Sequence, residues 1–260
     1  MSLRTHSLNV SFGIASSAPV LDGVDFSLQP GRFDMIVGAN GAGKSTLLRA
    51  LAGLQPPTRG MVTLEEHNLN TIPLPQRARH IGFLPQEISP TFAYSVAETV
   101  ALGARVAGLG HWFDTGLSGA AARAVDHALE QVDALPLRDR RLDELSGGER
   151  RRVLIASVLA QKPRYLLLDE PAAMLDLHHQ AELFGLLRRL SEEGLSVCCV
   201  THDWNLAVGF ADRLTALHQQ RILASGPPRE LLTSSILATV FGDNFTLLHH
   251  PDGRPVVVLK

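Results

Sequence analysis

A glycine-rich segment, "GANGAGKST" at residues 38–46, has the residue types needed to hold a phosphate group. It fits the pattern G-x-x-x-x-G-K-[ST], in which successive backbone N–H groups surround an anion. Lys44 would reach the β- and γ-phosphates, and the Ser45 hydroxyl would bind Mg²⁺. The pattern predicts a nucleotide-binding loop made of Gly38, Ala39, Asn40, Gly41, Ala42, Gly43, Lys44, Ser45 and Thr46.

Two carboxylates follow an apolar run in "YLLLDE", residues 165–170. An apolar strand that ends in acidic residues would place them at the carboxyl edge of a parallel sheet, beside a phosphate loop. Asp169 would then belong to the Mg²⁺ shell through a water molecule, and Glu170 would polarise water for attack on the γ-phosphate. By itself such a pair is more often a helix cap or a solvated turn, so the catalytic interpretation depends on the upstream loop.

The stretch "LSGGE", residues 145–149, supports two compatible interpretations. Ser146 followed by Glu149 is a capping-box pattern, which predicts a helix over residues 147–161. A helix N-terminus that carries a serine and two glycines is also a second anion site, although it has no lysine and no carboxylate pair of its own. The sequence therefore offers two unlike half-sites for one phosphate, the second formed by Ser146, Gly147 and Gly148.

The elements that must position these motifs alternate between strand and helix. Apolar runs and helical spacing follow one another along the chain, with the phosphate loop between a strand and a helix. This alternation is typical of an α/β fold, here a P-loop ATPase core whose mostly parallel sheet is covered on both faces. The expected units are strands at 33–37, 61–64, 81–84, 164–169 and 196–202, and helices at 44–54, 177–193 and 203–212.

Three regions differ from this alternating core. Two β-like runs at 6–12 and 19–28 predict an antiparallel region near the N-terminus. The region of about 87–162 has helical spacing and is rich in alanine. We interpret it as a helical subdomain that is inserted into a single domain, residues 1–260. The C-terminal residues, about 227–260, predict two short helices followed by a hairpin.

The overall composition restricts the class of protein. The chain has 260 residues, a net charge of -2 and a pI near 6.6, so it lacks the basic balance typical of nucleic-acid-binding domains. Its apolar runs are far shorter than the roughly 20 residues that span a bilayer, and we see no secretory signal. We therefore expect a cytoplasmic protein. Cys198 and Cys199 are expected to be buried on opposite faces of a strand, not to form a disulfide or a metal site.

Taken together, the motifs resemble those of ATP-binding cassette ATPases. Their order along the chain is that of the family, from Gly38 to Asp203, and the flanking residues agree. The resemblance implies ATP hydrolysis, with ATP and Mg²⁺ as cofactors. The matching stretches are the loop at 38–46, Gln86 in "FLPQ", the signature "LSGGE", "LLLDEP", Asp176 in "MLD" and His202 in "VTHD".

The resemblance also implies how the motifs are used. Cassettes of this family dimerise head to tail, so each ATP would lie between the phosphate loop of one copy and the signature of the other. Phe12 matches the position whose aromatic ring stacks on adenine. Gln86 would contact Mg²⁺ and the attacking water, and it would begin the lobe that meets a membrane partner. Asp176 would bridge the two copies, and His202 would contact the γ-phosphate.

Two positions depart from the family pattern. The signature ends in Glu149 where glutamine is commonest, and residues 172–174 are "AAM" in place of the usual small polar residues. Glutamate is an acceptable capping residue, so we expect the first change to cost little function. The second change leaves open how the dimer contact near Ala172 and Met174 is made.

These features favour the ATPase subunit of a membrane importer. It would bind permease subunits at the cytoplasmic face of the inner membrane, would be linked indirectly to a substrate-binding protein, and would not bind nucleic acid. Residues 92–103 and the C-terminal residues resemble cassettes of importers for iron–siderophore, haem or cobalamin. The alternatives are a molybdate or tungstate importer, an exporter, or a cassette ATPase that acts on nucleic acid or ribosomes. A P-loop kinase would have no use for the signature.

The stretch that follows Gln86 contains two aromatic residues, Phe92 and Tyr94, among small and polar ones. One interpretation is that both pack into the core of the helical subdomain. The other is that they belong to a groove that receives a short cytoplasmic helix of the permease.

Overall fold

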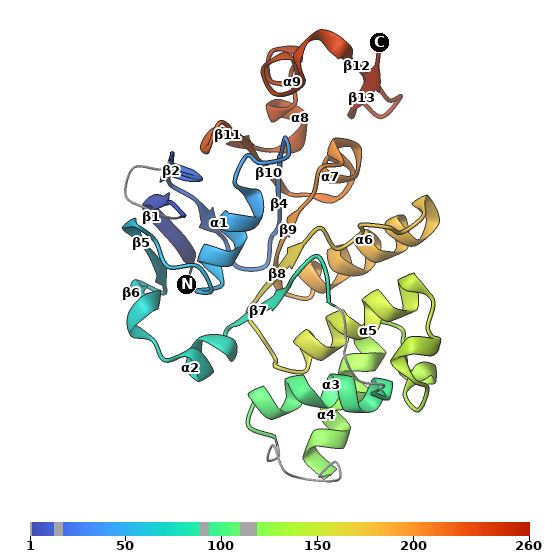
Figure 1. The fold of residues 1–260 in the computed structure, drawn as a ribbon. Helices are drawn as coiled ribbons and strands as arrows, with labels where there is room; N and C mark the ends of the chain where they lie inside the picture. The colour runs from blue at the N-terminus through green and yellow to red at the C-terminus, as the bar shows by residue number, and fades with distance from the viewer. Residues whose placement is uncertain (1, 13–17, 89–93, 110–118) are drawn as a thin grey trace.

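The computed structural model describes residues 2–12, 18–88, 94–109 and 119–260, which are built around a six-stranded sheet (Figure 1). The strand order is β11-β10-β4-β9-β8-β7, and every neighbouring pair is parallel except β10 and β11. The mostly parallel sheet expected from the sequence is therefore confirmed. Its strands are β4 (Phe33–Gly38), β7 (Ile81–Leu84), β8 (Tyr165–Asp169), β9 (Ser196–Val200), β10 (Arg213–His218) and β11 (Arg221–Gly226).

A separate antiparallel sheet is formed mainly by the N-terminal residues, as the sequence predicts. β1 pairs with β2, β3 and β5, and β6 pairs with β5. The single run expected over 19–28 is divided into two strands, because β2 and β3 pair with different parts of β1. The strands are β1 (Leu3–Val10), β2 (Leu21–Val24), β3 (Ser27–Leu28), β5 (Arg59–Leu64) and β6 (His67–Asn68).

The helix that follows the phosphate loop, α1 (Lys44–Leu51), packs against both sheets. Its side chains Leu47, Leu48 and Leu51 are fully buried in a cluster with apolar residues of the antiparallel sheet and of β4, β8 and β9. Apolar contact on both sides fixes the axis of the helix, and therefore the position of the loop at its N-terminus.

The opposite face of the central sheet is covered by α6 (Leu177–Glu192) and α7 (Trp204–Phe210). Side chains on a strand alternate between the two faces, and the cysteines of β9 illustrate this. Cys198 lies in the cluster under α1, whereas Cys199 lies in the cluster under α6 and α7. Both thiols are buried and free, so the expectation of two packing residues is confirmed.

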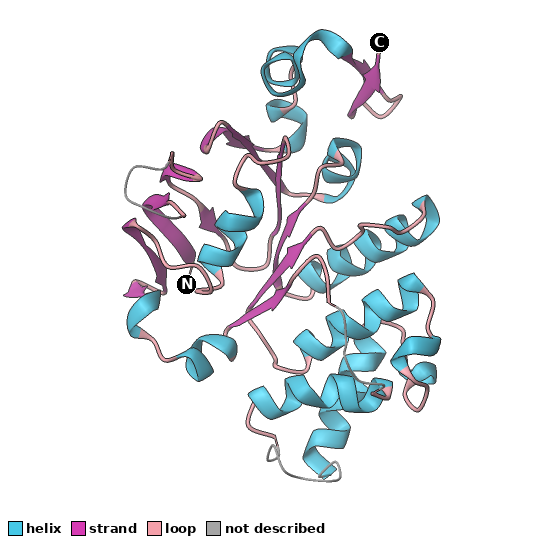
Figure 2. Ribbon diagram, viewed as in Figure 1, coloured by secondary structure: helices cyan, strands magenta, loops and turns pink. Residues whose placement is uncertain are grey.

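Figure 2 shows that helices gather at one end of the molecule, opposite the C-terminal hairpin. They fall within the region of about 87–162 for which the sequence predicts a helical subdomain. Apolar residues of these helices share one buried cluster with the central sheet. The boundaries of the subdomain remain a prediction. The helices are α3 (Val96–Val106), α4 (Gly119–Gln131) and α5 (Gly147–Leu159), and the shorter α2 (Leu74–Ala78) precedes β7.

The C-terminal residues form the helices and the hairpin that the sequence predicts, but the hairpin of β10 and β11 was not predicted. Its turn places Gln219 and Gln220 in the left-handed region, with φ of 45° and 65°. Asparagine and glycine are the residues that usually indicate such a turn, so two glutamines did not predict a hairpin here. The predicted elements are α8 (Pro228–Leu231), α9 (Ser234–Phe241), β12 (Phe245–His249) and β13 (Pro255–Leu259).

Within the part of the chain that the structure describes, the helices lack the combined length and apolar character needed to cross a membrane.

Candidate functional site

One pocket of about 750 Å³ gathers most of the residues that the sequence singles out. It lies at the carboxyl ends of parallel strands, because the phosphate loop follows β4, Gln86 follows β7, Glu170 follows β8 and His202 follows β9. Ligands of open α/β sheets bind at this edge. The pocket is lined by Val20, Gly38, Ala39, Asn40, Gly41, Gly43, Lys44, Ser45, Thr46, Gln86, Glu170, His202 and Phe241.

The backbone of the phosphate loop can be formed only by glycine at two positions. Gly38 has φ of 150°, and a Cβ there would lie 2.2 Å from the backbone oxygen of Leu217. Gly43 has φ of 102°, and a Cβ there would lie 2.6 Å from the backbone oxygen of Val20. Any side chain at either position would therefore meet both backbone strain and a clash with a rigid carbonyl group.

Lys44 is held against the loop that precedes it. Its Nζ donates to the backbone oxygens of Gly38 at 2.9 Å and of Ala39 at 3.0 Å. Burial lowers the pKa of Lys44, and the nearby carboxylates Glu170 and Asp169 oppose this shift. The ammonium group is thus poorly hydrated and placed where an anionic phosphate can replace its carbonyl partners.

Ser45 and Asp169, two residues that the sequence predicts for the Mg²⁺ site, lie in contact with each other. The Ser45 hydroxyl donates to Asp169 Oδ1 at 2.9 Å. Burial raises the pKa of Asp169, and the hydrogen bond from Ser45 opposes this shift. Hydroxyl and carboxylate oxygens are the ligands that Mg²⁺ prefers, so these residues fit the ion. A cation beside Asp169 would also favour its ionised form.

Glu170 is the residue on which Gln86 and His202 converge. Its Oε2 accepts from Gln86 Nε2 at 3.3 Å and lies 3.4 Å from His202 Nδ1. Its backbone has φ of 43°, a left-handed conformation that costs free energy for a residue with a side chain. The N–H of Glu170 donates to the Val200 oxygen at 3.1 Å, which holds this conformation in place.

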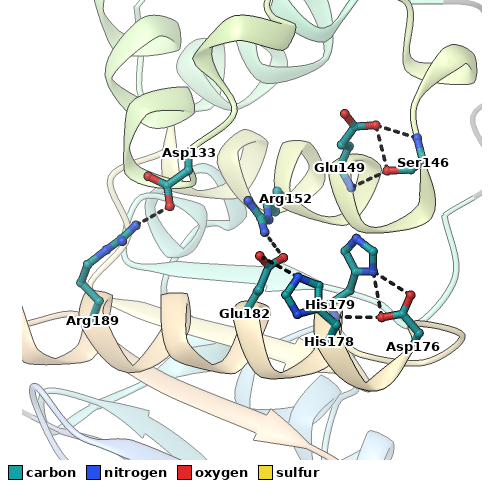
Figure 3. Close-up of polar contacts among 9 residues, drawn as sticks. All are labelled: Asp133, Ser146, Glu149, Arg152, Asp176, His178, His179, Glu182 and Arg189. Atoms are coloured by element: carbon teal, nitrogen blue, oxygen red, sulfur yellow. Dashed lines mark hydrogen bonds and ion pairs between the residues drawn. The ribbon is translucent and has the colours of Figure 1, made fainter.

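The signature, residues 145–149, forms the capping box that the sequence predicts (Figure 3). Glu149 Oε2 accepts from the Ser146 N–H at 2.9 Å and from its hydroxyl at 2.8 Å, and the Glu149 N–H donates to Ser146 Oγ at 3.3 Å. Glutamate therefore caps the helix as expected. Within the described residues, Ser146, Gly147 and Gly148 do not line the pocket of the phosphate loop.

The first turn of α6 lies against the first turn of the signature helix α5, as Figure 3 shows. Asp176 caps α6 by accepting from the His179 N–H at 2.9 Å, and hydrogen bonds from His179 lower the pKa of Asp176. The His179 ring covers Gly148, where a Cβ would lie 2.7 Å from its Cδ2. Met174, two residues before Asp176 in the chain, is 97% exposed. The predicted role of Asp176 between two copies stays a prediction.

Of the three aromatic residues that the sequence singles out, the two that the structure describes do not line the pocket. Phe12 is 52% exposed and is not among the described residues that line the pocket, so its contact with adenine stays a prediction. Tyr94 is 40% exposed just before α3, whereas Phe92 lies outside the described residues. Conversely, sequence reasoning missed Val20 and Phe241, which line the pocket from distant parts of the chain and carry no local motif.

A phosphate loop, a hydroxyl and carboxylate pair, and a second carboxylate beside Gln86 and His202 define a P-loop ATPase. Residues 21–173 match the sequence profile of the ABC transporter family, and the chain belongs to this family. It binds and hydrolyses ATP.

Known proteins resemble the chain over most of its length. The hemin import ATP-binding protein HmuV of Nitrobacter winogradskyi is 39% identical over 264 residues, which cover 98% of this chain and 94% of the relative. A metal-chelate type ABC transporter in an inward-facing conformation is 29% identical with a TM-score of 0.83, covering 100% of this chain and 98% of that chain. Dimeric MJ0796, a bacterial ABC transporter cassette, is 26% identical with a TM-score of 0.74, covering 87% and 98%. The family resemblance predicted from the sequence is confirmed.

Proposed function

We propose that two copies of this chain form the ATPase of a membrane importer for hemin. The observation that carries the proposal is the division of the phosphate-binding groups. The pocket holds Lys44, Ser45 and Glu170, whereas the second anion site at Ser146 starts a different helix outside it.

A head-to-tail pair of copies would complete the site. The N-terminus of α5, with its capping serine and two glycines, would supply N–H groups and the positive end of a helix to an ATP held by the other copy. Asp176 would lie at the same interface, because His179 fixes it beside Gly148. The dimeric state of MJ0796, a cassette of the same fold, supports this arrangement.

The residues of the pocket have distinct proposed roles. Lys44 would exchange its carbonyl partners for the outer phosphates. Glu170 would orient and polarise the attacking water, since its carboxylate lines the pocket beside Gln86 and His202. Ser45, Asp169 and Gln86 would hold Mg²⁺, with Asp169 acting through water. When bound, the ion would supply positive charge to the phosphates.

The proposed cargo follows from the likeness to named importers. The relative that covers 98% of this chain at 39% identity is named for hemin import, and the similar solved transporter is of metal-chelate type. A cassette drives transport through its permease, so its relationship to importers is a better guide to cargo than its own pocket. Hemin is therefore proposed ahead of iron–siderophore complexes and cobalamin.

Coupling to the permease is proposed to run through the helical region. Gln86 precedes this region, and Tyr94, which is 40% exposed, lies at its entrance. ATP binds the closed dimer more tightly than the open one, so closure would move Gln86 and the permease together. The chain would thus be bound to the cytoplasmic face of the inner membrane through its permease, and a substrate-binding protein would deliver hemin from the other side.

Deletion of the gene in the source organism tests this proposal. The deletion strain should lose growth on hemin as the only iron source and should keep growth on a ferric siderophore. The wild-type gene should restore growth, while Lys44→Ala, expressed at the same level, should not. Loss of growth on the siderophore alone, or on cobalamin alone where that vitamin is required, would assign a different cargo; unimpaired growth on hemin would refute the proposal.

A further inference from the structure

Helix α5 carries three consecutive arginines, and only the middle one is buried. Arg152 pairs with Glu182 at 2.5 Å on the surface shared with α6 (Figure 3), and Arg150 is partly exposed. Arg151 is 9% exposed. A run of charges usually forms a solvated helix face, so nothing in the three arginines themselves indicates that one of them is buried.

The Arg151 guanidinium reaches two segments of the catalytic pocket. One terminal nitrogen donates to the backbone oxygens of Pro85 at 3.3 Å and of Gln86 at 3.4 Å. The other donates to the backbone oxygen of Asp169 at 3.3 Å. The segments that carry Gln86 and Glu170, whose side chains meet at 3.3 Å, are therefore bound to the same guanidinium.

Burial of this cation is costly for stability. Its Nε is buried and has no hydrogen-bond partner among the described residues. Desolvation lowers the pKa of Arg151 to about 10, so the group stays charged at neutral pH. Three backbone oxygens satisfy a guanidinium less well than a carboxylate would, and apolar residues of similar volume often replace buried charges without loss of stability. Packing alone does not explain an arginine here.

We propose that Arg151 is a positioning residue that couples the signature to the hydrolytic groups. Its helix begins at the signature serine, Ser146, and its guanidinium ends on the carbonyl groups beside Gln86 and Glu170. A displacement of α5 when the signature engages ATP of the other copy would be passed to both segments by one rigid group. The planar guanidinium can hold several oxygens at fixed spacing, which the single ammonium of lysine cannot. This inference rests on the proposed roles of Gln86, Glu170 and the signature.

Substitution of Arg151 by methionine tests the coupling, with Arg150→Met as the matched control on the same helix. In Arg151→Met, kcat for ATP hydrolysis should fall by about tenfold or more, because small misplacement of reacting groups has large effects on rate. The Kd for ATP of the single chain should stay within about twofold, since the residue does not line the pocket. Arg151→Lys should retain an intermediate kcat, and Arg150→Met should match the wild type.

A double-mutant cycle with Gln86→Ala separates coupling from general damage. If Arg151 acts through Gln86, the loss from Arg151→Met should be smaller in the Gln86→Ala background than in the wild type. A wild-type kcat in folded Arg151→Met would overturn the inference. A fall in kcat that is fully explained by a smaller folded fraction, measured by thermal unfolding, would also overturn the inference. If the methionine variant does not fold, a wild-type kcat in Arg151→Lys and Arg151→Gln overturns it. A wild-type kcat in Gln86→Ala would instead refute the proposed role of Gln86.

Discussion

Replacement of Glu170 by glutamine should separate ATP binding from ATP hydrolysis. The amide has the size of the carboxylate, and its oxygen can still accept from Gln86, which donates to Glu170 Oε2 at 3.3 Å. Lys44 and Ser45, which are proposed to hold ATP and Mg²⁺, make their hydrogen bonds to Gly38 and Asp169 and not to Glu170, so the substitution should leave both in place. What is lost is the base, and general-base catalysis contributes about 10²–10⁴-fold to rate, or about 3–5 kcal/mol of barrier.

The assay measures kcat and Kd for ATP on the purified chain with Mg²⁺. Glu170→Gln should show a fall in kcat of about 10²-fold or more, and its Kd should change by less than about threefold. Glu149→Gln is the matched control, because it makes the same chemical change in a carboxylate that only caps a helix. Its kcat should stay near that of the wild type.

A second readout is the oligomeric state. Because ATP is not consumed in Glu170→Gln, the ATP-bound dimer should accumulate and sediment as such. A kcat of Glu170→Gln near the wild-type value would refute the assignment of Glu170 as the base. A loss of ATP binding that equals the loss of kcat would show that the carboxylate acts in binding instead.

Three further predictions concern other parts of the molecule. Lys44→Ala should weaken ATP binding by about tenfold or more, measured by calorimetry, because a hydrogen bond from a buried cation to phosphate is lost; unchanged affinity would contradict the loop assignment. Burial raises the pKa of Asp34 to about 6 from 3.8, so the folded chain holds a proton that the unfolded chain releases. Stability should therefore fall by about 1 kcal/mol from this group between about pH 5 and pH 7, and urea unfolding of Asp34→Asn should lack that slope. Tyr94→Asp should abolish co-purification with the permease while the isolated chain keeps its ATPase activity; normal assembly would remove Tyr94 from the proposed contact.

Much of the fold could be predicted because the central strands are short apolar runs that end at recognisable motifs. The phosphate loop could be predicted from its residue pattern between a strand and a helix, and the positive φ of Gly38 and Gly43 explains why that pattern requires glycine. The convergence of Gln86 and His202 on Glu170 follows once three parallel strands end at one edge of a sheet. Local pattern is sufficient where backbone geometry or strand direction decides the outcome.

Features that depend on distant contacts could not be read from the sequence. The β10 and β11 hairpin turns on two glutamines in the left-handed region, and the backbone oxygen of one of them, Gln220, accepts from the N–H of the distant Asp22 at 2.9 Å. Arg151 lies between two other arginines, and nothing in that run distinguishes the one that is buried. Phe241 reaches the pocket from a helix near the C-terminus. In each case tertiary packing decides the position, and a single sequence does not encode that locally.

Mixing two inactive variants shows whether each ATP site is shared between two copies of the chain. Lys44→Ala removes the loop function and Ser146→Arg blocks the signature, so a mixed dimer has one site with both parts intact and one with neither. In an equal mixture, half of the randomly formed dimers are mixed, and each mixed dimer has one intact site out of two. The mixture should therefore contain roughly a quarter of the intact sites that the same amount of wild-type protein contains. ATPase activity should reappear on mixing although each variant alone is inactive. No recovery on mixing, or normal hydrolysis by Ser146→Arg alone, would contradict it.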